Sequence, residues 1–319
     1  MKYLFRIFIF STFAMSIYSC KNGEKNLNKQ MDRNFRYVLS RNTNVVYADS
    51  FLIIDNWYIS DYDLICISKN PPFFYEIDTH DFSLKKKYGE KGHAEGEWQL
   101  PFAFIIDKNR KLYIESFGGG KCIITSNNNI QKRVIQEPSP LNRVELFKFP
   151  IIGYAQYTSN NITWKLVNVE NDQLIDSIMF VDTSKKGKAY LWDFQWNSYN
   201  NTIVMAHSQK ECFSVINLDS NTHKIKDVTV YNGIGEHNEY SDFYAGVACS
   251  KDFIYLLSVR NVDLRTMSGK SDVEIYDYKG NAIGLIHIDI LASRIIYDEA
   301  NSQLLFTSME DTMIHSLEL

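Results

Sequence analysis

A pair of β-hairpins recurs along the chain, and this repetition restricts the possible folds more than any other property of the sequence. The first hairpin of each pair has an apolar strand, a turn rich in Asp, Asn, Ser or Lys, and a second apolar strand. Its six copies start at Phe51, Phe102, Val144, Asp193, Tyr244 and Ser293. The second hairpin is complete in five copies, with turns centred at Thr79, Asn127, Glu170, Asp219 and Tyr278. These centres lie 48, 43, 49 and 59 residues apart, which is typical of four-stranded propeller blades.

The sixth unit is incomplete. After Thr312 only MIHSLEL remains, which is enough for a third strand but leaves no fourth. The missing outer strand can come from the start of the chain, from FRYVLSR at Phe35 or NVVYAD at Asn44. Such pairing leaves no open edge between the terminal blades. We therefore predict an all-β fold, a six-bladed β-propeller over residues 35–319 closed by an N-terminal strand.

The glycine-rich stretch GEKGHAEGEW at residues 89–98 falls between the outer strand of one predicted blade and the inner strand of the next. A related stretch, GIGEHNEYSDFY, starts at Gly233. A phosphate-binding loop needs a helix directly after its glycines, and neither stretch is followed by a helical pattern. The two stretches are therefore interpreted as loops between blades, in which glycine supplies backbone conformations that other residues avoid.

The first twenty residues predict where the chain goes in the cell. Lys2 and Arg6 precede a short apolar run over residues 7–15, and Ile17-Tyr18-Ser19 leads to Cys20. This pattern is a secretory signal, too short for a membrane span, although an uncleaved anchor is the alternative reading. It resembles the lipobox of bacterial lipoproteins, which implies cleavage before Cys20 and acylation of that cysteine. The expected organisation is a signal peptide at 1–19 and a flexible, lipid-anchored tether at 20–34.

Charge and cysteine content narrow the function further. The net charge is −4 and no clustered basic face is evident, so we expect no nucleic-acid partner. Besides Cys20 there are four cysteines, without CxxC spacing, in apolar runs: Cys66, Cys122, Cys212 and Cys249. We interpret them as small buried residues, while an oxidising compartment would also permit a disulfide.

One blade carries a more specific pattern. Gly89, Gly92, Gly96-Glu97-Trp98 and Pro101 precede an apolar strand, Asp107, and a Leu-Tyr-Ile strand. This resembles the NHL repeat, and the whole chain resembles TolB-like six-bladed propeller lipoproteins of Gram-negative, Bacteroides-type bacteria. The resemblance implies an outer-membrane lipoprotein, expected to face the periplasm because no acidic run follows Cys20. Most members of that group have no established activity.

In a propeller, the loops that join blades and the loops that join second to third strands gather on one face. The sequence places aromatic, basic and imidazole groups in those loops, and an insertion from Arg260 to Asp272 accounts for the 59-residue spacing. The candidate binding residues are His93, Trp98, Phe117, His237, Tyr240, Arg260 and Arg265. The insertion is equally compatible with a solvated loop.

Two functions are compatible with the sequence, a calcium-dependent hydrolase and a non-catalytic binding module. Some six-bladed propellers are calcium-dependent lactonases or esterases, and Asp49, Glu145, Asp193 and Asp242 lie near predicted inner-strand starts, where they could hold Ca²⁺. No matching general base is evident, and no Gly-x-Ser-x-Gly motif occurs. We therefore expect a non-catalytic binding or scaffolding module at the cell envelope, without a cofactor, that recognises a protein or peptide and contacts the membrane through its N-terminal lipid.

Overall fold

The computed structural model describes most of the chain. The described residues are 16–18, 25–49, 52, 54–92, 101–106, 112–116, 121–126, 129–134, 142–148, 151–157, 161–168, 171, 173–181, 194–234, 242–263 and 265–319. Every regular element in these ranges is a β-strand. Among the described residues, no helix has the length and apolar composition needed to cross a membrane.

The strands form six sheets. Their main strands follow the chain in order. The first two sheets are β5 (Ile54–Ser60), β6 (Asp63–Ser68), β7 (Phe74–Asp78), β8 (Leu84–Tyr88) and β9 (Pro101–Ile106), β10 (Leu112–Ser116), β11 (Lys121–Ser126), β12 (Asn129–Val134). The next two are β13 (Asn142–Lys148), β14 (Ile151–Tyr157), β15 (Asn161–Asn168), β16 (Gln173–Val181) and β17 (Phe194–Tyr199), β18 (Thr202–His207), β19 (Cys212–Leu218), β20 (Ile225–Asn232). The last two contain β21 (Tyr244–Cys249), β22 (Phe253–Ser258), β23 (Asp272–Asp277), β24 (Ala282–Ile288) and β25 (Ala292–Asp298), β26 (Gln303–Ser308), β27 (Met313–Glu318).

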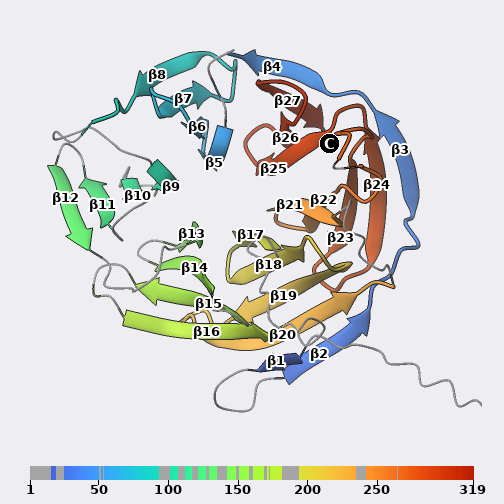
Figure 1. The fold of residues 1–319 in the computed structure, drawn as a ribbon. Coiled ribbons are helices and arrows are strands. Elements are labelled where there is room, and N and C mark those ends of the chain that lie inside the picture. The colour runs from blue at the N-terminus through green and yellow to red at the C-terminus, as the bar shows by residue number, and fades with distance from the viewer. Residues whose placement is uncertain are drawn as a thin grey trace, which may run out of the picture.

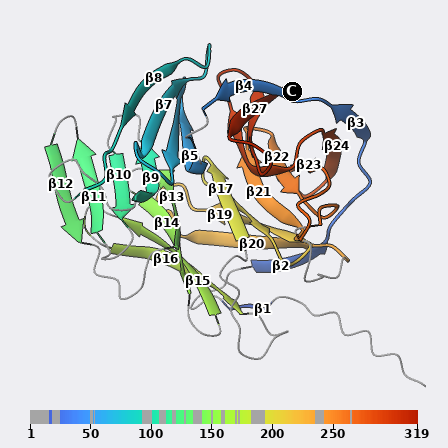
Figure 2. The same ribbon diagram turned by 45° about the horizontal axis from the view of Figure 1, so that its top comes forward.

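The sheets stand around a common centre, as Figures 1 and 2 show. In each sheet the first of these strands in the chain lies nearest the centre and the last lies near the rim. Residues 89–92 follow β8, at the rim of one sheet, and the next described element in the chain is β9, the inner strand of another sheet. The prediction of an all-β propeller is confirmed.

The hairpin turns use the residues that the sequence suggested. Asp61 links β5 to β6 with φ of 53°, and Asn200 links β17 to β18 with φ of 53°. Among residues with side chains, Asn and Asp adopt this left-handed conformation most readily. Gly89 has φ of 90°, which fits the role predicted for the glycines of its loop.

The core lies between neighbouring sheets. Trp164 on β15 and Trp196 on β17 pack edge to face, with ring centroids 5.3 Å apart. Gly153 makes this contact possible, because a Cβ there would come within 2.6 Å of Trp196 and 2.8 Å of Trp164. Similar apolar clusters fill the spaces from the sheet of β13–β16 round to the sheet of β5–β8. The five sheets that these clusters join are therefore held mainly by their neighbours, as expected for side chains that alternate between two buried faces.

The start of the chain runs along the outside of this ring. β1 (Ser16–Tyr18) pairs with β16, and β2 (Lys25–Gln30) and β3 (Tyr37–Arg41) pair in parallel with β20 and β24. β4 (Asn44–Ala48) pairs antiparallel with β27, with Ala48 opposite Met313. We call residues 25–48 the N-terminal strap. Figure 1 shows it in blue along the rim of three consecutive sheets.

The strap corrects the prediction of a flexible tether at 20–34. Within that range, Lys25–Gln30 is a strand in register with Asp227–Asn232, and the side chain of Met31 is buried. The segment lacks aliphatic periodicity because β2 adds to a finished sheet edge through its backbone, so its own side chains need not form a core.

The described cysteines fit their interpretation. Cys66, Cys212 and Cys249 are free and buried. Burial raises the pKa of the Cys66 thiol well above its ordinary value. A buried, protonated thiol is a poor nucleophile, so the role of Cys66 is packing.

Acid is expected to destabilise the fold through His207, which is buried on β18. Burial, helped by the charge of Lys210, lowers the pKa of His207 from 6.5 to about 3. Between pH 6.5 and about 3, His207 therefore binds a proton in the unfolded chain but not in the folded chain. The stability that this residue contributes above pH 6.5 is lost as the pH falls through that range. At pH 5 the loss is about 2 kcal/mol.

The measurement is urea unfolding at pH 7 and pH 5 for the wild type and for His207→Gln, which cannot titrate. The variant is expected to lose this share of the pH dependence, whatever its absolute stability. The same difference between the two pH values in both proteins would contradict the assignment.

Candidate functional site

A cavity of about 540 Å³ lies at the centre of the ring. Its lining residues come from four of the inner strands, β5, β17, β21 and β25, and from the turns that follow two of them. The hairpins that build each sheet place one strand per sheet at the centre, so residues far apart in sequence meet there. A cavity of this size can receive a small ligand or a few residues of a peptide.

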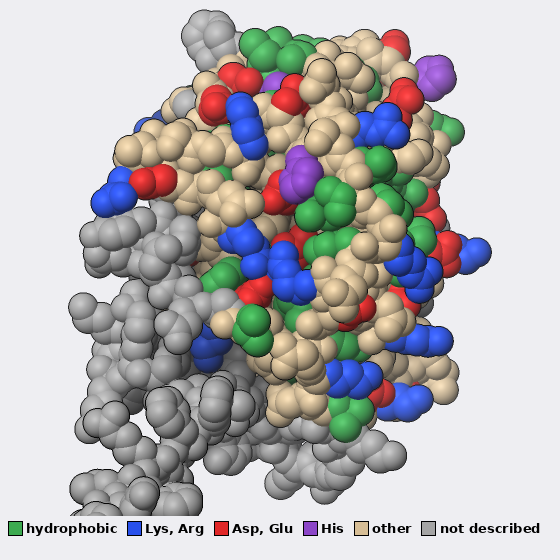
Figure 3. Space-filling view, turned by 90° about the vertical axis from the view of Figure 1, so that its right-hand side faces the viewer, with side chains coloured by type: hydrophobic (Ala, Val, Ile, Leu, Met, Phe, Trp, Pro, Cys, Tyr) green, Lys and Arg blue, Asp and Glu red, His purple; other side chains and the backbone are tan. Residues whose placement is uncertain are grey.

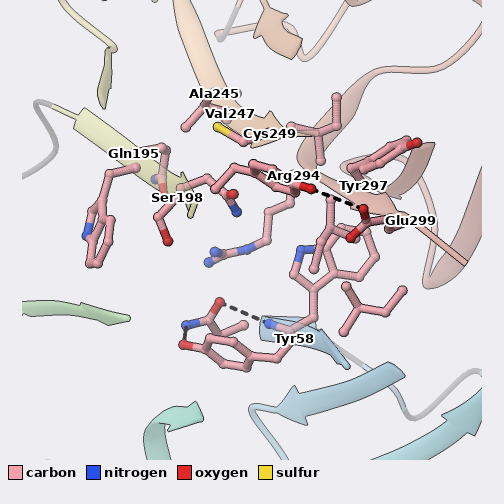
Figure 4. A pocket seen from close by; sticks show the side chains of 18 of the residues that line it. Tyr58, Gln195, Ser198, Ala245, Val247, Cys249, Arg294, Tyr297 and Glu299 are labelled. Atoms are coloured by element: carbon pink, nitrogen blue, oxygen red, sulfur yellow. Dashed lines mark hydrogen bonds between the residues drawn. The ribbon is translucent and has the colours of Figure 1, made fainter. Parts of the chain in front are cut away.

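Many of the residues that line the cavity have polar side chains. Amides come from Asn56, Gln195 and Asn197, hydroxyls from Tyr58, Ser198, Tyr199 and Tyr297, and charges from Asp61, Arg294 and Glu299. Figure 4 shows Arg294 extending from β25 toward the middle of the cavity. Aromatic surface is supplied by the partly exposed rings of Tyr58 and Tyr297, whereas Trp57 and Trp196 border the cavity but are buried between sheets. The site therefore offers hydrogen-bond donors, acceptors and aromatic faces together.

Two hydrogen bonds order part of this wall. The Asn56 side-chain amide donates to the Tyr58 hydroxyl at 2.9 Å, and the Tyr199 hydroxyl donates to the Glu299 carboxylate at 3.3 Å. Desolvation and the nearby Glu299 charge raise the pKa of Tyr199. The Tyr199 hydroxyl thus stays protonated at neutral pH and joins the end of β17 to the turn after β25.

A second polar cluster joins the strap to two sheets. Glu211 precedes β19 and Glu274 lies on β23, and both carboxylates are buried. Arg33 of the strap contacts Glu211 at 2.6 Å and Glu274 at 3.1 Å. Arg260, after β22, contacts the same two carboxylates at 2.6 and 3.2 Å. Two arginines therefore neutralise two buried carboxylates.

The tyrosines next to this cluster complete its hydrogen bonding. The hydroxyls of Tyr244 and Tyr276 each donate to Glu274 at 3.1 Å. Burial alone would lower the pKa of Arg33, but Glu274 and the tyrosine hydroxyls outweigh it and raise that pKa above its ordinary value. Burial and Glu274 likewise raise the pKa of both tyrosines. Through these contacts the cluster anchors the strap to two sheets.

The structure describes only part of the predicted binding face. His93, Trp98, Phe117, His237 and Tyr240, and also Cys20, lie outside the described residues. Arg260 belongs to the ionic cluster and is mostly buried. Arg265 has a 60% exposed side chain and pairs with Asp263 at 3.0 Å. Of these two arginines, Arg265 alone is well exposed to solvent.

Of the four acidic residues considered as calcium ligands, Asp49 lies elsewhere than predicted. This residue follows β4 at the rim and pairs with Lys87 of β8 at 2.5 Å, so it lies away from the central cavity. The sequence analysis places Asp49 at the start of the inner strand that follows it. In the structure Asp49 instead belongs with β4, the outer strand that precedes it. Asp193 and the side chain of Glu145 lie outside the described residues, and Asp242 lies just before β21. Within the described ranges, no three His, Cys, Asp or Glu residues are grouped to hold a metal ion.

No protein-family model matches the chain, and no curated protein matches it in sequence. Solved structures do resemble it. Regucalcin from Agrobacterium tumefaciens, described as a calcium-binding protein, has a TM-score of 0.60 at 10% identity, covering 89% of this chain and 95% of its own. A putative exported protein from Bacteroides fragilis has a TM-score of 0.55 at 9% identity, with coverages of 91% and 98%. The β-propeller domain of Swd1 from Myceliophteria thermophila has a TM-score of 0.55 at 7% identity, with coverages of 87% and 99%. At these identities the likeness establishes the propeller fold alone.

Proposed function

We propose that the protein is a non-catalytic binding propeller at the cell envelope, and that its central cavity receives a carboxylate-bearing part of a protein or peptide partner. The observation that carries this proposal is the cavity of about 540 Å³ with Arg294 extending into it. A guanidinium at the centre of a partly desolvated site favours a carboxylate, because the two can form parallel charge-assisted hydrogen bonds.

The rest of the lining fits a peptide better than a fully charged or fully apolar ligand. Asn56, Gln195 and Asn197 each offer a donor and an acceptor, as a peptide main chain requires. The partly exposed rings of Tyr58 and Tyr297 supply flat aromatic surface for side chains. Most of these groups stand on strands, which hold them in place before the ligand arrives and so reduce the entropy cost of binding.

The test uses triglutamate as the acidic probe and trilysine as a probe of equal length and opposite charge. Binding is followed by isothermal titration calorimetry for the wild type and for Arg294→Gln. Loss of a hydrogen bond to a charged group costs roughly 1.5–3 kcal/mol, so we expect triglutamate to bind Arg294→Gln at least about tenfold more weakly. Trilysine is expected to bind neither protein.

Arg265→Gln is the matched control, because it removes one arginine charge from the predicted binding face instead of the cavity. Triglutamate is expected to bind this variant as it binds the wild type. A loss in Arg265→Gln with none in Arg294→Gln would move the site to the loops and overturn the cavity assignment.

The proposal includes location and ring architecture. We take the chain to be a TolB-like lipoprotein that is exported and acylated at Cys20, facing the periplasm from the outer membrane. Its signal-like N-terminus and its likeness to an exported Bacteroides protein support this. We also take the six sheets to be the blades of one closed ring, and the pairing of β4 with β27 supports this.

The calcium-dependent hydrolase is the second candidate. It is favoured by the likeness to a calcium-binding regucalcin and by Asp242, which lies before the inner strand β21. Under this hypothesis millimolar calcium raises the melting temperature, because an ion that binds the native state stabilises it, and Asp242→Asn abolishes the rise. Under the binding-module proposal calcium changes neither protein.

A further inference from the structure

β3 is an edge strand with an unusual surface. All five of its residues are exposed, including Tyr37, Val38 and Leu39 in sequence. Successive side chains point to opposite faces of a strand, so apolar groups stand on both faces of β3. Figure 3 views the side of the molecule on which β3 and β24 lie, and hydrophobic and basic side chains are mixed there. A run of this kind at a sheet edge is a ready template for another strand.

The backbone of β3 has a free edge within the described part of the chain. There β3 pairs only with β24, and no described strand lies beyond it. The Arg36 N–H donates to the Ile283 carbonyl at 3.1 Å. Because N–H groups alternate between the two edges of a strand, the N–H groups of Tyr37 and Leu39 point away from β24. These groups are available to a further strand.

The charges around this edge indicate what that strand would be. Exposed arginines stand at its two ends, Arg36 just before β3 and Arg41 as its last residue. If two copies of β3 paired antiparallel about Leu39, Arg36 of each copy would face Asn42 of the other and Arg41 would face Tyr37. A second copy would therefore bring two more arginines to this edge and no carboxylate, whereas opposite charges across a strand pair stabilise it. A segment with carboxylates near both ends complements the edge.

We propose that the free edge of β3 binds an extended segment of a partner protein by strand addition, and that the segment has alternating apolar residues between acidic ends. The main-chain hydrogen bonds to Tyr37 and Leu39 supply affinity, and Arg36 and Arg41 select the acidic ends. This surface lies at the rim and is separate from the central cavity.

The probe is a capped hexapeptide, Glu-Val-Thr-Val-Thr-Glu, and its controls are the same core with lysine ends and the same peptide with N-methylated valines. Amide hydrogen exchange of the strap is measured by mass spectrometry. The acidic peptide is expected to slow exchange at residues 37–41. The lysine-ended peptide should bind about tenfold more weakly, because two ion pairs become repulsive. The N-methylated peptide should give no protection, because its bonds to the edge are removed.

A protein variant gives a second test. Leu39→Pro removes an outward N–H and leaves the bonds to β24, since proline is tolerated on an edge strand where its missing N–H faces solvent. It is expected to lose protection by the peptide, while Leu39→Thr, which keeps the N–H, retains it. The melting temperatures of both variants are recorded. If Leu39→Pro does not fold, the comparison of the acidic peptide with its N-methylated form tests the strand addition instead.

Three results would overturn the proposal. The first is equal protection by the acidic and the N-methylated peptides, or by neither. The second is a concentration-dependent dimer in sedimentation that Leu39→Pro abolishes, which would make a second copy the occupant. The third is binding of the strap to anionic phosphatidylglycerol vesicles without any response to the acidic peptide, which would make a lipid surface the occupant.

Discussion

Replacing Glu274 with alanine is expected to lower the free energy of unfolding by about 3–5 kcal/mol. The carboxylate is buried and receives hydrogen bonds from Tyr244 and Tyr276, as well as ion pairs from Arg33 and Arg260. Without it, two buried hydroxyls lose their carboxylate acceptor, and Glu211 is the one carboxylate of the cluster left to pair with both arginines. Most of the destabilisation comes from these remaining groups, because a polar group that is buried without a partner has lost its hydration and gains no hydrogen bond in return. Urea unfolding followed by tryptophan fluorescence measures the change.

Glu318→Ala is the matched control, because Glu318 is an exposed glutamate at the end of β27. Its change is expected to stay within about 0.5 kcal/mol. A loss below about 1 kcal/mol for Glu274→Ala would mean that the cluster is accessible to water and does not anchor the strap.

Deleting residues 35–49 is expected to abolish cooperative folding or to cause aggregation. The deletion removes β3 and β4 and uncovers the edge of β27, whose Ile314 and Leu317 are buried. It also removes Phe35, which packs on Tyr276 with ring centroids 5.7 Å apart. An uncovered apolar edge strand pairs readily with other chains. Size-exclusion chromatography and a thermal melt monitored by circular dichroism measure the outcome.

Val45→Thr is the control for this deletion. Val45 is 54% exposed on β4, so the variant keeps the backbone pairing and changes one side chain at the surface. It is expected to remain monomeric and to unfold as the wild type does. A truncated chain that behaves like Val45→Thr would show that β4 does not hold the ring together.

The hairpins of the fold could be predicted because they are local. The pattern FLIIDNWYISDYDLICIS carries two apolar runs and a turn at Asp61, and it becomes β5 and β6. The turn at Asn200 is equally local. A repeating local unit with no helical pattern leaves few architectures other than a propeller.

The strap and its anchor could not be predicted in the same way. β2 and β3 pair in parallel with strands about 200 or more residues away in the chain, and their side chains carry little of the pattern that marks a core strand. The insertion from Arg260 was noticed as a loop of unusual length, but its first residue is held by Glu211 and Glu274. Nothing in the local sequence of a glutamate shows that it will be buried between two arginines.

The local sequence does not predict the central cavity, for a related reason. Three inner strands carry a polar lining residue, Asn56, Asn197 or Arg294, which on its own is typical of a solvated face. Only the arrangement of the sheets around a common centre brings these side chains together. A basic residue in the middle of an inner strand, as in SRIIYD at Arg294, is the one local signal that could have drawn attention to the centre.

The strap also sets an order of events during biosynthesis. β2, β3 and β4 leave the ribosome before any strand they pair with, and β27, the partner of β4, emerges last. Apart from β20, the first partner strand of the strap is β24, which is complete only at residue 288 of 319. β2 can therefore pair as soon as β20 has been made, whereas β3 and β4 meet their partner strands only near the end of translation.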